Sequence, residues 1–248
     1  MKRIAIFAVL ALLVVVAIPL VYFARIDLND FEDPLLNASR DGDVSAITEL
    51  LAGGNDANKT DAYNNTPLSI AAHFGQTQAI ELLLTNRALI DGVDGEMSPL
   101  HCAVYSGHRD AAAALLNNGA NPDRADKYGT TPLASAAAMG YAQTVKLLLD
   151  AGADVEHADN LGWRPLHVAL RSTRPTDADR LAIVTTLLEY GADPNANNVG
   201  GYEKDGEHDS HVGFRPATLP NQGNKPVAIA KSNGFTEIGD LLKTHGGT

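Results

Sequence analysis

Six prolines open the same short phrase, and the phrase recurs at an almost fixed spacing along the chain. They are Pro34, Pro67, Pro99, Pro132, Pro165 and Pro226, at intervals of 33, 32, 33, 33 and 61 residues. Leu or Val follows each proline, and small residues follow in turn, as in PLSIAAHFGQ and PLASAAAMGY. A period of this size indicates stacked copies of one small unit, each burying apolar surface on its neighbours.

Each unit is expected to hold two short helices. Proline suits the first turn of a helix, where its missing N–H costs nothing, and Thr66, Ser98 and Thr131 precede it as natural N-cap residues. A glycine free to take positive φ is expected to close the first helix at Gly42, Gly75, Gly107, Gly140 and Gly234. Paired leucines are expected to bury the second helix: Leu83/Leu84, Leu115/Leu116, Leu148/Leu149, Leu187/Leu188 and Leu241/Leu242. Gly119, Gly152 and Gly191 then stop that helix.

The phrases TPLSIAAHFGQ, SPLHCAVYSGH and RPLHVAL resemble the T-P-L-H-x-A signature of ankyrin repeats. The resemblance covers residues 31–248. It implies an all-α fold, an ankyrin-repeat solenoid of about six helix-turn-helix repeats in a domain spanning 34–248. The sequence departs from the pattern in three places: D-P-L-L replaces the signature in the first unit, Asn86-Arg87 replaces Gly-Ala, and Thr173 stands where glycine is expected.

Two insertions interrupt the period. About six extra residues within 172–180 are expected to lengthen the connection between the two helices of the fifth unit. About 22 more, within 199–224, enlarge the loop before Pro226. Because long loops are uncommon in compact domains, this polar, glycine-rich loop is either functional or disordered.

The front of the chain predicts a membrane span. Residues 4–24 are apolar and uncharged, follow Lys2 and Arg3, and are long enough for a bilayer core of about 20 residues. We therefore expect an uncleaved signal anchor over 1–25 and a short tether over 26–33, with a cleaved signal peptide as the alternative. The positive-inside bias places the repeats outside the cytoplasm, in the bacterial periplasm or, alternatively, a eukaryotic secretory lumen.

The acidic balance bears on possible partners. After Ala24 there are 17 basic and 30 acidic residues, a net charge of −13. This charge disfavours nucleic acid, which needs basic surfaces. One interpretation is that the charge only keeps the protein soluble. The alternative is that it attracts a basic protein partner. The only cysteine, Cys102, precludes an internal disulfide and is expected to be a small buried residue.

No catalytic constellation is found in the sequence, and we expect neither enzymatic activity nor a cofactor. G-x-S-x-G, H-E-x-x-H, Walker-type and C-x-x-C patterns are missing. His101 and His167 hold the histidine position of the signature, and the resemblance implies that they bond turn backbone. One loop cluster, Asp205, Glu207, His208, Asp209 and His211, has metal-ligand chemistry but no regular spacing, so a solvated acidic loop is favoured over a metal site.

The resemblance implies a partner-binding surface formed by the turn tips and the exposed side of the first helices, on the concave side of the stack. Large apolar side chains there are typical binding anchors, although they can also pack between neighbouring turns. The candidate contacts are Tyr63, His73, Phe74, Met97, Tyr105, Tyr128, Met139, Leu161, Trp163, Arg171 and Tyr202.

Together these features predict a non-catalytic ankyrin-repeat adaptor on the periplasmic face of a bacterial inner membrane, capturing a protein through its groove and long loop. Two settings of bacterial proteins similar to this one are expected. One is an immunity protein that neutralises a periplasm-targeted toxin such as a lipase. The other is a factor supporting periplasmic catalase and peroxide resistance. A structural envelope tether and a metal-dependent hydrolase built on the 199–224 loop are further alternatives.

Overall fold

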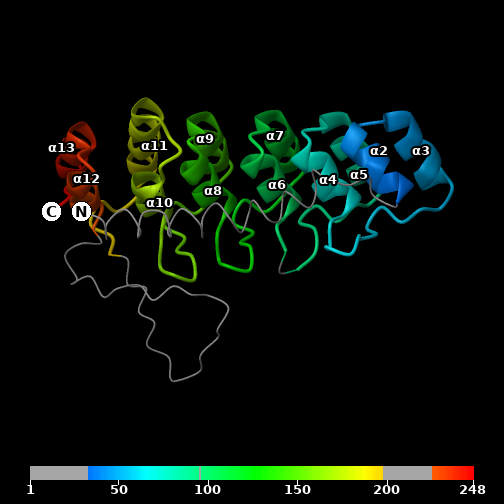
Figure 1. Ribbon diagram of the computed structural model, residues 1–248, viewed down its shortest axis with the longest axis horizontal. Coiled ribbons are helices and arrows are strands. Elements are labelled where there is room, and N and C mark those ends of the chain that lie inside the picture. Colours follow the sequence, from blue (N-terminus) through cyan, green and yellow to red (C-terminus); the bar gives the residue numbers. More distant parts are fainter. Residues whose placement is uncertain (1–32, 95, 198–224) are drawn as a thin grey trace, which may run out of the picture. The chain divides into compact units, whose positions relative to one another are not determined.

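The computed structural model describes residues 33–94, 96–197 and 225–248 (Figure 1). Within these residues the chain forms twelve α-helices and no strand, which confirms the all-helical fold. None of the described helices is long and apolar enough to cross a membrane. The expected span over residues 4–24, most of the tether, the 199–224 loop and Tyr202 lie outside the described residues.

The chain forms two compact units that divide between Asp126 and Lys127. Unit 1 holds three helix pairs: α2 (Pro34–Asp41) with α3 (Val44–Ala52), α4 (Pro67–His73) with α5 (Thr77–Thr85), and α6 (Pro99–Tyr105) with α7 (Arg109–Asn117). The first helices pack in the order α2, α4, α6, and the second helices pack in the order α3, α5, α7. Unit 1 is therefore two layers of helices with one helix of each pair in each layer.

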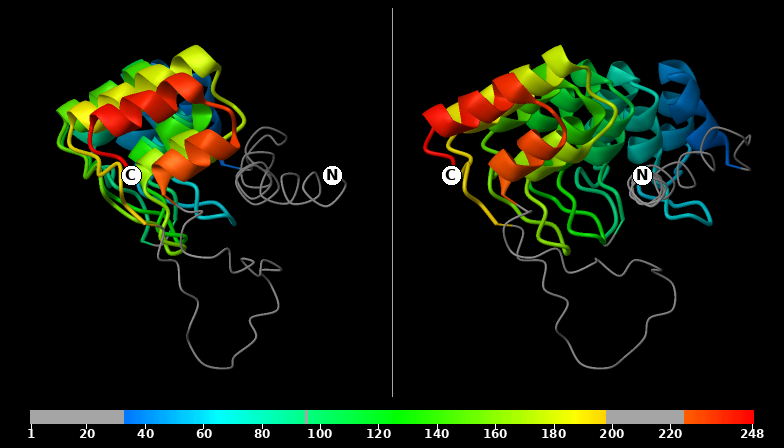
Figure 2. Two further views of the ribbon diagram at one scale, coloured as in Figure 1. Left: turned by 90° about the vertical axis from the view of Figure 1, so that its left-hand side faces the viewer. Right: turned by 60° about the vertical axis from the view of Figure 1, so that its left-hand side comes forward.

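Unit 2 repeats this plan. Its pairs are α8 (Pro132–Met139) with α9 (Ala142–Asp150), α10 (Pro165–Arg171) with α11 (Asp177–Glu189), and α12 (Pro226–Ser232) with α13 (Thr236–Thr244). Helix α10 packs on α8 and α12, and α11 packs on α9 and α13. Within each unit, the turns that precede the first helices extend to one side of the layers (Figure 1 and Figure 2).

The first helices begin as the proline phrase predicts, with proline in the first turn and a capping side chain before it. Thr66, Ser98 and Thr131 accept hydrogen bonds from the backbone N–H three residues later, at 3.1, 3.2 and 3.3 Å. Asp33, the last residue of the expected tether, caps α2 by accepting from Leu35 N at 2.8 Å. These caps satisfy N–H groups that the helix itself leaves without partners.

The helix ends follow the glycines. All five glycines expected to end the first helices have positive φ, between +69° and +86°. Arg87, which replaces glycine after α5, takes the same left-handed conformation with φ +67°. A side chain with a Cβ is strained in this conformation, so this turn holds Arg87 at a cost in backbone energy.

The core lies between the layers of each unit and consists mainly of alanine and leucine. Every expected leucine pair contributes at least one side chain with no solvent exposure: Leu83, Leu115, Leu148, Leu187 and Leu242. Ala71, Ala103 and Ala137 on the first helices are equally inaccessible. These small side chains let neighbouring first helices approach closely and pack without voids.

The insertion in the fifth helix pair was expected to lengthen only the connection between its two helices, and the structure differs from this prediction. Helix α11 has 13 residues, whereas α9 and α13 have 9, so part of the insertion extends the second helix at its N-terminus. Thr176 caps this longer helix by accepting from Asp179 N at 3.1 Å. The remainder forms the segment 172–176.

Arg180 replaces the missing glycine at the end of α10. Its side chain is 4% exposed, and its Nη1 donates to the carbonyl oxygens of Ala169 and Ser172 at 2.5 and 2.8 Å. Its Nη2 donates to Pro175 O at 3.3 Å, and its guanidinium lies 4.4 Å from the centre of the Phe235 ring. Burial lowers the pKa of Arg180, and Asp177 opposes this shift. A basic side chain thus satisfies helix-end carbonyls that a left-handed glycine turn satisfies elsewhere.

Candidate functional site

The turns before the first helices share a construction that points one side chain outward. In unit 1, Asp61 Oδ1 accepts from the backbone N–H groups of Tyr63 and Asn65 at 2.7 and 2.9 Å. In unit 2, Asp159 Oδ1 accepts from Leu161 and Trp163 at 2.8 Å each. An aspartate that bonds backbone ahead of it is a common way to fix a tight turn. Tyr63 and Leu161 therefore occupy equivalent positions at the turn tips.

Three large apolar side chains stand at this tip position: Tyr63, Tyr128 and Leu161 are 43%, 40% and 37% exposed. The residue after each of them has positive φ, at Asn64, Gly129 and Gly162. Asparagine and glycine are the residues that adopt this conformation most readily. The sequence prediction placed all three tip residues on the binding surface, and their exposure makes them accessible to a partner.

In unit 2 the two tips lie against each other. Asn160 donates from its backbone N–H to Tyr128 O at 3.0 Å and from Nδ2 to Lys127 O at 3.1 Å. A Cβ on Gly129 would lie 2.7 Å from Asn160 Oδ1, so only glycine permits this approach. Tyr128 and Leu161 are thereby presented from neighbouring, interlocked turns.

In unit 1 the tip of the neighbouring turn is polar. Asn64 Nδ2 donates to Glu96 Oε1 at 3.3 Å, so the turn of Tyr63 faces a carboxylate on the next turn. Unit 1 thus presents one exposed aromatic tip beside an acid, whereas unit 2 presents two apolar tips together.

The other candidates in unit 1 are used for packing. Phe74, Met97 and Tyr105 are half-buried and pack against the buried side chains of Leu36 and Ile70. Their contacts match the alternative in which such residues pack between neighbouring repeats.

His73 is buried in the same part of unit 1. It is 8% exposed, its Nδ1 lies 2.7 Å from Ser106 Oγ, and its ring meets that of Phe74 edge-on at 4.8 Å. A side chain so enclosed offers a partner little surface, and its place in a binding site stays a prediction.

The remaining candidates in unit 2 are Trp163, Arg171 and Met139, and they make two separate contacts that involve arginine. The Arg171 guanidinium lies 4.5 Å from the centre of the Trp163 ring, within the range of a cation–π contact. Met139 is 8% exposed, and its sulfur accepts from Arg174 Nη1 at 3.1 Å. Arg174 was not among the sequence candidates. Its position in the inserted segment 172–176 was the signal that could have identified it.

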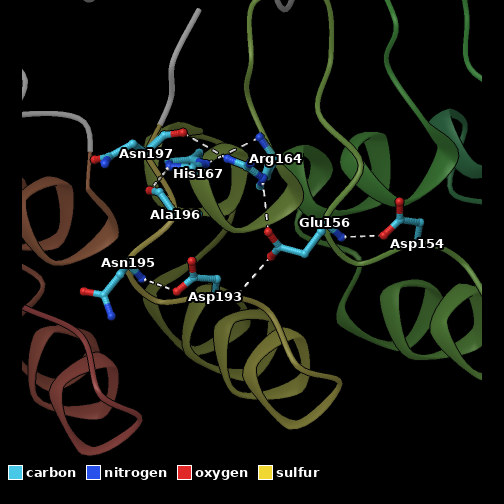
Figure 3. A network of polar contacts seen from close by, with 8 residues as sticks. All are labelled: Asp154, Glu156, Arg164, His167, Asp193, Asn195, Ala196 and Asn197. Atoms are coloured by element: carbon cyan, nitrogen blue, oxygen red, sulfur yellow. Dashed lines mark hydrogen bonds and ion pairs between the residues drawn. The ribbon is translucent and has the colours of Figure 1, made fainter.

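A polar network connects neighbouring turns of unit 2 (Figure 3). Arg164 donates from Nη1 to Asn197 O at 2.9 Å and pairs through Nε with Glu156 at 3.1 Å. Glu156 also accepts from Asp193 N at 2.9 Å. Arg164 occupies the place of the capping Thr or Ser, and this change was the sequence signal for its role. The network fixes the backbone immediately before the long insertion.

The histidines of the signature are structural, as the resemblance implied. His101 and His167 are fully buried. Arg164 N–H donates to His167 Nδ1 at 3.4 Å, so Nε2 carries the proton and donates to Ala196 O at 3.0 Å. Nδ1 of His101 lies 3.2 Å from the capping Ser98 Oγ.

Cys102 is fully buried, which confirms the expectation for the only cysteine. Burial raises the pKa of its thiol to about 12, so the reactive thiolate does not form near neutral pH. Among the described residues, no group of three His, Cys, Asp or Glu side chains could hold a metal ion. The acidic cluster of residues 205–211 lies outside them.

Stacked helix pairs, two of them preceded by turns that Asp61 and Asp159 fix, define a helical repeat protein. A family model of ankyrin repeats (three copies) matches residues 35–126 and 119–198. The chain belongs to the ankyrin-repeat family.

Three curated relatives that share the repeats are longer proteins than this chain. The chain is 35% identical over 113 residues to a putative ankyrin repeat protein of fowlpox virus, covering 44% of this chain and 32% of the relative. It is 32% identical over 105 residues to the palmitoyltransferase Hip14 of Drosophila melanogaster, covering 42% and 16%. It is 32% identical over 99 residues to the human ankyrin repeat and SOCS box protein 2, covering 38% and 15%. The chain thus spans about a third or less of each of these relatives.

Membership of this family makes the chain a protein–protein interaction module, since ankyrin repeats generally bind proteins and do not catalyse reactions. The similarity to the palmitoyltransferase is confined to the ankyrin region, so it transfers no activity to this chain.

Proposed function

We propose that this chain is a non-catalytic module that captures a partner protein through the turn tips of unit 2. The observation that carries this proposal is the interlocked pair of exposed tips, Tyr128 and Leu161. Exposed apolar side chains of this size contribute little to the stability of the fold. When a partner covers them, water is released from their surface, which favours binding. Fixing them on rigid turns lowers the entropy lost on binding.

The place of display is proposed from the sequence alone. The apolar segment 4–24 behind Lys2 and Arg3 favours an anchor in a bacterial inner membrane with the repeats in the periplasm. Protease accessibility in spheroplasts tests it: a C-terminal tag is expected to be digested from outside while the membrane stays intact. A tag that is protected until the cells are lysed would contradict periplasmic display.

The two settings expected from the resemblance, toxin immunity and support of a periplasmic catalase, differ in the protein that is captured. The identity of that protein therefore decides between them. The acidic net charge of −11 favours long-range attraction of a basic partner in either setting.

The capture itself is tested with the full-length chain in its own cells, by cross-linking and mass spectrometry of what co-purifies. A Tyr128→Ser, Leu161→Ser double variant is expected to lose roughly tenfold or more of the captured partner, because both apolar anchors are removed. Leu89→Ser is the matched control, since Leu89 is 57% exposed but lies outside the tips. Equal recovery with the double variant and the wild type would contradict the proposal.

A further inference from the structure

Unit 2 holds an arginine that is fixed in place but has no acid beside it. Arg171 is exposed at the end of α10, and its guanidinium is stacked 4.5 Å from the centre of the Trp163 ring. Among the described residues, no carboxylate pairs with Arg171 and no acceptor takes its N–H groups. Neighbouring protein atoms displace water from the guanidinium and lower its pKa, and arginine stays charged at neutral pH.

The support of Arg171 is itself held rigidly. The backbone N–H of Trp163 donates to Asp159, and the indole meets the His167 ring edge-on at 5.8 Å. His167 is fully buried and bonded on both nitrogens. A guanidinium stacked on so fixed a ring keeps its N–H edge free to meet a planar acceptor, which is the arrangement that suits carboxylate recognition.

Two further cations of unit 2, Arg174 and Lys127, have no acid partner in the described part of the chain. Arg174 donates to its neighbours Met139 and, through its backbone, Ser172. Lys127 Nζ lies 5.4 Å from the centre of the Tyr128 ring. Most other described cations near a turn are paired, as Arg164 is with Glu156.

We define the tip surface of unit 2 as Lys127, Tyr128, Leu161, Trp163, Arg171 and Arg174. Its six residues carry three positive charges beside the carboxylate of Asp159, which accepts from the backbone N–H groups of Leu161 and Trp163, although the net charge of the chain is −11. Net charge acts over long range and is screened beyond about 10 Å at 0.1 M salt, whereas contact chemistry depends on the groups at the surface itself. The sign of the contact surface is therefore opposite to that of the chain.

We propose that the tip surface of unit 2 binds an acidic, apolar segment of a protein. In this complex a carboxylate of the partner accepts two N–H groups of Arg171, and an adjacent apolar side chain packs on Tyr128 and Leu161. The inference rests on the proposed capture function and names the chemistry of the captured segment. It differs from the expectation drawn from net charge, which favours a basic partner.

Trp163 provides a direct probe, because it is the only tryptophan of the chain. Short synthetic peptides of alternating Asp and Leu, without aromatic residues, are titrated into the full-length protein while Trp163 emission is followed. Analogues with Asn or Lys in place of every Asp are the matched probes. The Asp peptide is expected to bind roughly tenfold more tightly than the Asn analogue, since hydrogen bonds to charged groups are the stronger ones.

Variants locate the binding on the protein. Arg171→Gln is expected to weaken binding of the Asp peptide by roughly tenfold, and Arg171→Lys by less, because lysine keeps the charge but loses the planar fork. Arg109→Gln, an exposed arginine on α7 of unit 1, is expected to change nothing. Thermal unfolding of each variant shows that the fold is retained.

Several outcomes would overturn the proposal. They are no response to the Asp peptide, equal or tighter binding of the Lys analogue, and binding that is unchanged in Arg171→Gln. Vesicles of phosphatidylglycerol that shift Trp163 emission where the peptides do not would assign the surface to lipid. Self-association that depends on Arg171 would assign it to a second copy. Loss of partner capture in the Tyr128→Ser, Leu161→Ser variant, together with indifference to Arg171, would sink this inference while leaving the proposed function intact.

Discussion

Half-buried Phe74, Met97 and Tyr105 of unit 1 pack against Leu36 and Ile70, whereas Tyr128 and Leu161 of unit 2 stand exposed at interlocked tips. All five residues lie in turns or first helices that the repeat pattern assigns to the binding side. The neighbouring side chains decide the difference. In unit 1 Leu36 and Ile70 form a small apolar cluster that takes in Phe74, Met97 and Tyr105, while the tip residue Tyr63 stays exposed, as Tyr128 and Leu161 do in unit 2.

Cations near the turns are paired in both units, as Arg164 is with Glu156 in unit 2, but Arg171 is an exception. In unit 1 Lys59 pairs with Asp33 and Arg124 pairs with Asp94, so these cations join neighbouring turns. In unit 2 Arg171 is stacked on Trp163 without a carboxylate among the described residues. The comparison teaches that a position in the repeat predicts where a side chain can point, while its immediate neighbours determine whether it serves packing or contact.

The largest expected effect concerns the way unit 2 holds its insertion. Arg180→Met is expected to cost about 2–4 kcal/mol of unfolding free energy, because the carbonyls of Ala169 and Ser172 at the end of α10 and that of Pro175 in the insertion lose their donor. Urea unfolding measures it. The control Arg174→Met, an exposed neighbour on the same insertion, is expected to stay within about 0.5 kcal/mol. Equal losses would show that Arg180 does not anchor the insertion.

The most direct pair of variants compares the two units themselves. Phe74→Ala is expected to cost about 2 kcal/mol, less than for a fully buried phenylalanine because Phe74 is only half-buried. Tyr128→Ala is expected to change stability by no more than about 0.5 kcal/mol, since its ring is 40% exposed. Thermal or urea unfolding of both variants measures these losses of stability. A larger loss for Tyr128→Ala than for Phe74→Ala would contradict the comparison.

A smaller effect is expected from substitutions at one backbone position that is equivalent in the two units. Arg87→Gly in unit 1 is expected to stabilise by about 0.5–1 kcal/mol, because glycine removes most of the strain at φ +67° but adds some chain entropy on unfolding. Gly152→Ala, at the equivalent helix end of unit 2 with φ +88°, is expected to destabilise by about 1 kcal/mol. A Cβ at Gly152 meets no atom within 4 Å, so steric contact does not contribute. Effects of the same sign would contradict this account of both turns.

The smallest expected effect is a pH dependence at the start of unit 1. Desolvation acts to raise the pKa of Asp33, but the hydrogen bonds from Lys59 and from the backbone of Leu35 and Leu36 outweigh it and hold the pKa below its usual value of 3.8. The carboxylate thus stabilises the fold above pH 3.8, and this contribution is lost as the pH falls through the lowered pKa. Comparing urea unfolding of the wild type and Asp33→Asn at pH 7 and pH 2.5 checks it. The stability deficit of the variant is expected to be smaller at pH 2.5 than at pH 7, and an equal difference at both values would refute the linkage.

Features set by local sequence were predictable. The capping bonds of Thr66, Ser98 and Thr131 and the positive φ of Gly140 follow from residue types at fixed offsets, and so did the burial of Cys102. Each depends on a few neighbouring residues, which the repeat period aligns.

Features that join distant residues were not predictable. The stacking of Arg171 on Trp163 and the anchoring of the insertion by Arg180 depend on how segments 172–176 and 159–163 fold against the helices. One local signal was available: Thr176 and Asp179 form a Thr-x-x-Asp cap, which marks the early start of α11. Whether Phe74 packs and Tyr128 does not could not be read from either turn alone, because the difference lies in Leu36, Ile70 and Met97.

The central claim is that unit 2 makes the contact through its two adjacent apolar tips, whereas unit 1 has the single exposed tip Tyr63 and packs Phe74, Met97 and Tyr105 against its own core. Hydrogen–deuterium exchange of the full-length chain, with and without the partner that co-purifies, tests it most directly. The account predicts new protection of amides in residues 127–131 and 160–174, with residues 61–74 and 93–105 unchanged. Protection confined to the turns of unit 1, with residues 160–174 exchanging as in the free protein, would contradict it.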